Sequence, residues 1–176
     1  MDTVAATSLE KVIGLALTGN KIGGITILYI TDDASVHDIR HDIIDALRDF
    51  LHASSIKSRE IQSFLLANLE VATGEALTNA HTHRKEEGQA YVVFGQIDDR
   101  FVTLIANECF NQNDMQCPSC EELNDQMQEH MRGCHLIKVL LEESSMLYGS
   151  DLESFFIFPD MNNAGMAKWA LSVGHG

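Results

Sequence analysis

The chain has 176 residues, of which 45% are hydrophobic, so we expect one domain over residues 1–176 with a full core. Its 26 acidic and 12 basic residues give a formal charge of −14, which disfavours nucleic acid and anionic membranes as partners. No apolar run approaches the roughly 18–20 residues that cross a bilayer, and residues 1–10 lack the basic start of a secretory signal. We therefore expect a cytoplasmic protein with reduced cysteines.

The first half of the chain predicts three helices and one strand. Apolar residues over 4–18, followed by a Gly-Asn pair, predict a short N-terminal helix. The β-branched segment 25–30, bounded by Gly and Asp pairs, is typical of a strand. A helix capped by Ser35 is expected next, because apolar residues recur with a helical period up to Leu51. The following helix starts near Ser58 and continues to about residue 83.

The second half predicts strands around a polar loop. Residues 90–97 and 101–106 form an expected hairpin joined by 98–100. Residues 111–131 are polar and predict a mobile loop, followed by a short helix over 134–142 after Gly133. We expect a closing hairpin over 145–148 and 154–158, and no element is assigned to 161–176.

Runs of helices followed by runs of strands predict an α+β fold. The expected architecture is a two-layer α/β sandwich, in which a mixed or antiparallel sheet is covered by helices on one face.

Three polar residues recur every four positions near the end of the helix that starts at Ser58. Glu75, Asn79 and His83 therefore share one helix face, one turn apart. A carboxylate, an amide and an imidazole stacked on an Ala- and Leu-rich helix favour a bound cation or phosphate. An alternative is that His81 and His83 form a solvated pair at the end of the helix.

The segment from Glu75 to His83 reads Glu-Ala-Leu-Thr-Asn-Ala-His-Thr-His, and it resembles the N-box of the GHKL (histidine-kinase-like) ATPases. It is most similar to the anti-sigma-factor serine/threonine kinase branch. The segment 132–137, Arg-Gly-Cys-His-Leu-Ile, is similar to a glycine-containing segment of the same branch. The resemblance covers about residues 25–158 and implies the Bergerat fold with Mg·ATP as cofactor.

The resemblance also implies a role for each matched residue. Asn79 would bind the Mg²⁺ that accompanies the nucleotide, since its carbonyl oxygen suits a hard cation. Glu75 would be catalytic, orienting or deprotonating the attacking hydroxyl or water. His83 would bond the phosphates or brace the helix. Backbone N–H groups near Gly133, at an expected helix start, and the Arg132 cation would hold phosphate oxygens.

The adenine-reading segment departs from the family pattern. Asn107 stands where the family has an Asp that accepts a hydrogen bond from the adenine amino group, and both following glycines are absent. An amide oxygen still accepts, but it lacks the strength of a charged acceptor. The sequence therefore predicts a diverged ATP site, in which nucleotide binding is weak or absent.

The four cysteines lie within 109–134. Cys117 and Cys120 form a Cys-x-x-Cys pair in the expected loop, with Cys109, Cys134, His130 and His135 nearby in sequence. Such ligands suit zinc or an iron–sulfur cluster. The alternatives are a redox-sensitive thiol pair, or two exposed loop thiols plus two buried small residues.

These observations favour a regulatory protein that resembles the anti-sigma-factor kinases and acts by binding a protein partner. The resemblance implies a homodimer and, as partner, a sigma factor or its antagonist. Two alternatives remain: an active Mg·ATP-dependent serine/threonine protein kinase, and a metal or redox sensor that uses the cysteine cluster.

Overall fold

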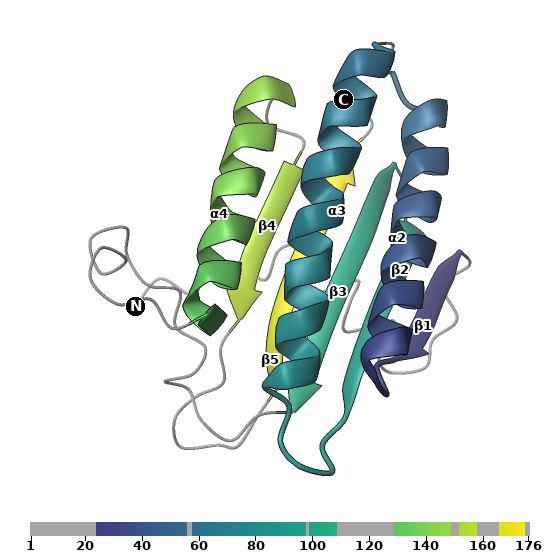
Figure 1. Ribbon diagram of the computed structural model, residues 1–176. Helices are drawn as coiled ribbons and strands as arrows, with labels where there is room; N and C mark the ends of the chain where they lie inside the picture. The colour runs from purple at the N-terminus through teal and green to yellow at the C-terminus, as the bar shows by residue number, and fades with distance from the viewer. Residues whose placement is uncertain are drawn as a thin grey trace, which may run out of the picture.

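In the computed structural model, five antiparallel strands of the described residues form one sheet in the order β1-β2-β3-β5-β4 (Figure 1). The structure describes residues 24–55, 58–97, 99–108, 129–148, 152–157 and 166–174. The strands are β1 (Ile25–Tyr29), β2 (Ala90–Ile97), β3 (Arg100–Glu108), β4 (Leu152–Ile157) and β5 (Met166–Gly174).

The three helices of the described part of the chain lie side by side on one face of this sheet (Figure 1). They are α2 (Asp33–Ala53), α3 (Arg59–Thr82) and α4 (Glu129–Tyr148). The predicted α+β two-layer sandwich is therefore confirmed, with an antiparallel sheet. The expected helix over 4–18 lies outside the described residues.

The main core lies between the helices and the sheet. Every second residue of the central strands points to the helices, so strand alternation supplies one wall of the core. Its members include Val92, Phe101, Ile105 and Trp169, which pack against Leu47, Leu69, Leu77 and Ile137 of the helices. All of these side chains are at most 4% exposed.

The opposite face of the sheet carries a second, smaller apolar cluster. Val93, Val102, Leu104 and Ala170 are at most 5% exposed, and the half-buried Tyr91 packs against them. Burial, together with the neighbouring Tyr29, raises the pKa of the Tyr91 hydroxyl above its ordinary value of 10.0. Both faces of the central strands are therefore removed from water.

Side-chain caps set the starts of α2 and α3. Ser58 accepts a hydrogen bond from the Ile61 N–H, which confirms the predicted start of α3. For α2 the predicted cap is wrong, because Asp32 rather than Ser35 occupies the N-cap. Ser35 instead completes a capping box: its N–H donates to Asp32 and its hydroxyl accepts from the Asp32 N–H.

The C-terminal elements differ most from expectation. α4 extends from 129 to 148, so residues 129–131 are helical rather than loop, and Gly133 lies inside the helix. Residues 145–148 form the end of this helix, so the strand predicted there is wrong. A short apolar run does not distinguish a strand from a helix. The closing hairpin instead pairs β4 with β5. β4 overlaps the predicted strand at 154–158, whereas β5 lies in the region 161–176, for which no element was predicted. The rest of the expected loop, 111–128, lies outside the described residues.

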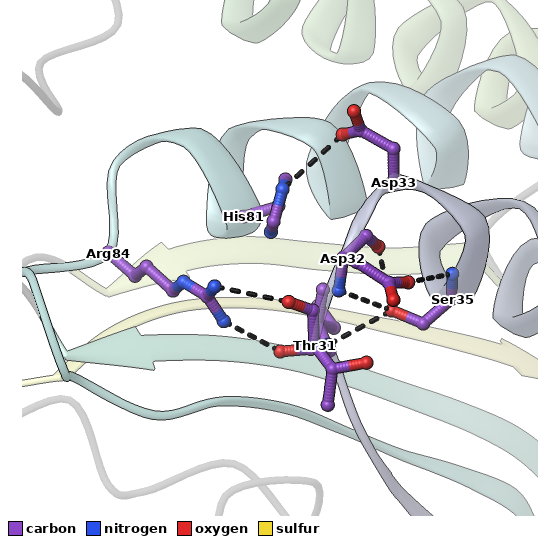
Figure 2. Close-up of polar contacts among 7 residues, drawn as sticks. Thr31, Asp32, Asp33, Ser35, His81 and Arg84 are labelled. Atoms are coloured by element: carbon purple, nitrogen blue, oxygen red, sulfur yellow. Dashed lines mark hydrogen bonds and ion pairs between the residues drawn. The ribbon is translucent and has the colours of Figure 1, made fainter.

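A polar cluster joins the end of α3 to the turn between β1 and α2 (Figure 2). The Arg84 guanidinium donates to the carbonyl oxygens of Ile30 and Thr31, at 2.8 and 3.2 Å. His81 Nε2 lies 3.3 Å from an Asp33 oxygen, and the His81 side chain is only 22% exposed. His81 is therefore not the solvated side chain of the alternative interpretation. This cluster holds β1, α2 and α3 in one arrangement.

We expect Arg84→Ala to lower the free energy of unfolding by about 1–3 kcal/mol, because two hydrogen bonds from a charged donor are lost. Arg48→Ala serves as a control, because the ion pair of Arg48 with Asp45 is 46% and 65% exposed and should contribute less than about 1 kcal/mol. Urea unfolding of the three proteins measures both values. Equal stability of wild type and Arg84→Ala would show that this cluster does not hold the elements together.

Candidate functional site

Glu75 and Asn79 lie on the face of α3 that packs against α4. A Cβ atom added at Gly133 of α4 would lie 2.8 Å from Glu75 Oε2 and 3.1 Å from Asn79 Nδ2. A real Cβ atom at this position would require the flexible end of the Glu75 side chain to shift, so the glycine leaves room for this contact. The structure therefore brings together three residues that the sequence analysis assigned to one site.

The Asn79 amide also contacts the next residue of α4. Its Nδ2 donates to Cys134 Sγ at 3.8 Å, and both side chains are half-buried. Further along the same interface, Asn68 Nδ2 donates to Ser144 Oγ at 3.1 Å. A polar stripe of Asn68, Glu75 and Asn79 thus lies between the two helices.

Sequence reasoning did not include Asn68, Ser144 or the Cys134 contact. The signal for Asn68 was present, since Asn68, Glu75 and Asn79 follow the helical spacing i, i+7 and i+11. The partners on α4 have no comparable signal, because the register of two packed helices depends on tertiary structure.

His83 stands at the C-terminal end of α3 rather than within it. It is the C-cap residue, and its backbone N–H donates to the Asn79 carbonyl at 2.9 Å. The ring is half-buried. Its backbone position is compatible with the bracing role that the resemblance implies.

Asn107 lies near the end of β3, on the face of the sheet that the helices cover. Its side chain is 3% exposed, and its Nδ2 donates to the Glu108 carbonyl at 3.4 Å. The Lys85 N–H donates to the same carbonyl at 2.8 Å, so the segment after α3 is bonded to the end of β3. The end of α3, which carries Asn79, and the end of β3, which carries Asn107, lie toward the same end of the molecule, where α4 begins (Figure 1).

Arg132 and Gly133 lie in the first two turns of α4, which begins at Glu129. The free N–H groups of a helix are those of its first four residues, so here they belong to 129–132. Gly133 follows them, and its proximity to Glu75 and Asn79 arises from its missing side chain. The expectation that Gly133 opens the helix is wrong.

The cysteine pair Cys117 and Cys120 lies outside the described residues. Within the described residues, no group of three or more His, Cys, Asp or Glu side chains is arranged to hold a metal ion. Cys134 is half-buried, and its sulfur accepts the Asn79 hydrogen bond.

The side-chain oxygen atoms of Glu75 and Asn79 are ligands of the type that Mg²⁺ prefers. Both side chains lie against Gly133, which directly follows the four free N–H groups at the positive start of α4, and such a helix end favours phosphate. The donor set thus fits Mg·phosphate chemistry. The buried Asn107 does not supply the charged acceptor that the family uses for adenine.

No protein-family model and no curated protein sequence matches this chain. Among solved structures, the chain is similar to the mycobacterial sensor histidine kinase MprB, at 12% identity and a TM-score of 0.44. The match covers 85% of this chain and 97% of that one. The described part of the chain contains no helix that is long and apolar enough to cross a membrane.

We expect Gly133→Ala to change stability little by itself, because the gain in helix propensity of about 1 kcal/mol is offset by the clash with Glu75. In a Glu75→Ala background the clash with the carboxylate is absent, so the same change should stabilise the protein by about 0.5–1 kcal/mol. Thermal and urea unfolding of the four proteins of this double-mutant cycle measure the coupling. Strictly additive effects would contradict the contact between Gly133 and Glu75.

Proposed function

We propose that this chain is a regulatory protein of the kind represented by the anti-sigma-factor serine/threonine kinases. It has a diverged Mg·ATP site and acts by binding a protein partner, such as a sigma factor or its antagonist. The observation that carries the proposal is the packing of Glu75 and Asn79 of α3 against Gly133 of α4. These residues come from the two segments on which the resemblance rests.

Two features of this site support weak nucleotide binding. The Asn79 amide is already engaged with Cys134, so a ligand must share it or displace it. Asn107 is buried and neutral, and its loss of charge relative to an Asp costs about 1–3 kcal/mol in a hydrogen bond to adenine. This alone weakens binding by roughly one to two powers of ten.

Exposed apolar side chains on the helices support a protein-binding role. Large hydrophobic residues on the outer surfaces of α3 and α4 are between 37% and 86% exposed: Ile61, Phe64, Val71, Leu136, Val139, Met146 and Leu147. Apolar surface of this kind is common at protein interfaces. The helical layer is therefore the surface that we propose for the partner.

A second candidate is an active Mg·ATP-dependent serine/threonine kinase. It is favoured by the proximity of Glu75 and Asn79 to the same point of α4, which places a candidate base beside a candidate magnesium ligand. The two candidates differ in the affinity for Mg·ATP.

We expect calorimetry with Mg·ATP to detect weak binding at most, dependent on Mg²⁺ and abolished in Asn79→Ala. The charge of −14 repels the bare triphosphate, so the cation must carry it. Asn68→Ala is the matched control. It also removes an amide from this face of α3, but that amide contacts Ser144 and not the candidate site.

Tight binding that needs both Mg²⁺ and Asn79 would favour the kinase over the diverged site. Tight binding that is independent of magnesium and unchanged in Asn79→Ala would contradict the site itself.

We also propose a homodimer that uses the edge strand β1. β1 pairs with β2 on one side and, among the described strands, has no neighbour on the other. Its outward residues Ile27 and Tyr29 are 45% and 60% exposed, which is unusual for an unprotected edge.

Light scattering at tens of micromolar should therefore show a dimer, and Ile27→Lys should convert it to a monomer because a lysine opposes pairing at an edge. Val71→Lys is the matched control on α3, since Val71 is also 45% exposed. A monomeric wild type, or equal effects of the two lysines, would refute pairing through β1.

A further inference from the structure

A cavity of about 620 Å³ lies between the end of α2 and the start of α3. Its lining residues are Arg48, His52, Ser54, Arg59, Gln62, Ser63 and Leu66. Asn79 lies about 25 Å further along α3 than Gln62, at 1.5 Å per residue. The cavity is therefore separate from the site around Glu75 and Asn79.

The charge of this cavity is opposite to that of the chain. Two arginines and a histidine line it, and none of the described residues that line it is acidic, although the chain as a whole carries a formal charge of −14. A local excess of positive groups in an acidic protein attracts anions to that place. Ser63 adds a hydroxyl, and Leu66 supplies an apolar wall.

The ends of the two helices add to this preference. Arg59 is the first residue of α3 and lines the cavity, so the start of this helix lies beside it. The start of a helix carries a partial positive charge. At the opposing, negative end of α2, one carbonyl group is hydrogen-bonded within the protein. The Leu51 carbonyl accepts hydrogen bonds from the Ser54 N–H, the Ser54 hydroxyl and Gln62 Nε2.

A purely structural role explains only part of the arrangement. Arg48 and His52 complement the negative end of α2, and Arg48 also pairs with Asp45. That pair is exposed, so an anion can replace Asp45 at little cost. Arg59 stands at the start of α3, where the helix dipole disfavours a cation; the adjacent Glu60 offsets part of this cost, and a bound anion would offset more.

We propose that this cavity binds a small phosphomonoester. The guanidinium groups of Arg48 and Arg59 hold the phosphate, because their planar forks match its oxygen atoms, and the organic group lies along Leu66. The volume lies within the range of about 300–1,000 Å³ that is typical of small-molecule sites. The inference does not depend on the function proposed above.

Calorimetry with phenyl phosphate tests this, at fixed ionic strength and with EDTA present so that no Mg²⁺ reaches Asn79. We expect saturable binding that Arg59→Gln weakens by about tenfold or more, as expected for a lost charged hydrogen bond. Lys138→Gln, which removes one positive charge from an exposed position on α4, should change affinity less than about twofold. Asn79→Ala should have no effect, and inorganic phosphate should bind several-fold more weakly than phenyl phosphate.

Arg59 is exposed, so its substitution leaves the core intact, and Arg48→Gln provides a second test with the same expectation. The proposal is overturned if phenyl phosphate does not bind at millimolar concentration, or if Lys138→Gln weakens binding as much as Arg59→Gln. It is also overturned if Asn79→Ala, but neither arginine variant, abolishes binding, or if inorganic phosphate binds as tightly as phenyl phosphate.

Discussion

The close approach of α3 and α4 at Gly133 is the constraint on which the candidate site depends. Because Gly133 has no side chain, the Glu75 carboxylate and the Asn79 amide can lie against α4. The same two side chains are therefore part of the helix packing and part of the proposed ligand site. If the proposed ligand drew Glu75 or Asn79 away from α4, the contact between α3 and α4 at Gly133 would change with it.

Much of the fold could be predicted from the sequence because several elements carry complete local signals. α3 has a capping serine and a long apolar period, and the β2–β3 hairpin has two β-branched runs around a short turn. The shared face of Glu75 and Asn79 follows from spacing alone, and the structure places both residues on the α4 side of α3. The partners of that face on α4 could not be predicted, because they depend on how two helices pack.

The failures also have physical causes. The Met-Leu-Tyr run at 146–148 is too short to show a helical or a strand period, and α4 continues through it. The polar residues Lys168 and Ser172 interrupt the apolar pattern of β5 in the sequence. In the structure, Trp169, Leu171 and Val173 alternate onto the helix-covered face of the sheet. Its burial between β3 and β4, rather than its own propensity, determines that it is a strand.

The position of β5 has a consequence for the order in which the protein assembles. Among the described strands, β4 pairs only with β5, and β5 joins it to β3 across a long separation in sequence. The chain between β3 and β5, which includes α4 and β4, must bring its ends together before β5 can bond to β3, and that closure has an entropy cost. The β2–β3 hairpin has no such requirement. We therefore expect the β2–β3 hairpin to form early in folding and the β4–β5 pair to join the sheet later. The β4–β5 pair should also be the first part of the sheet to open in native-state hydrogen exchange.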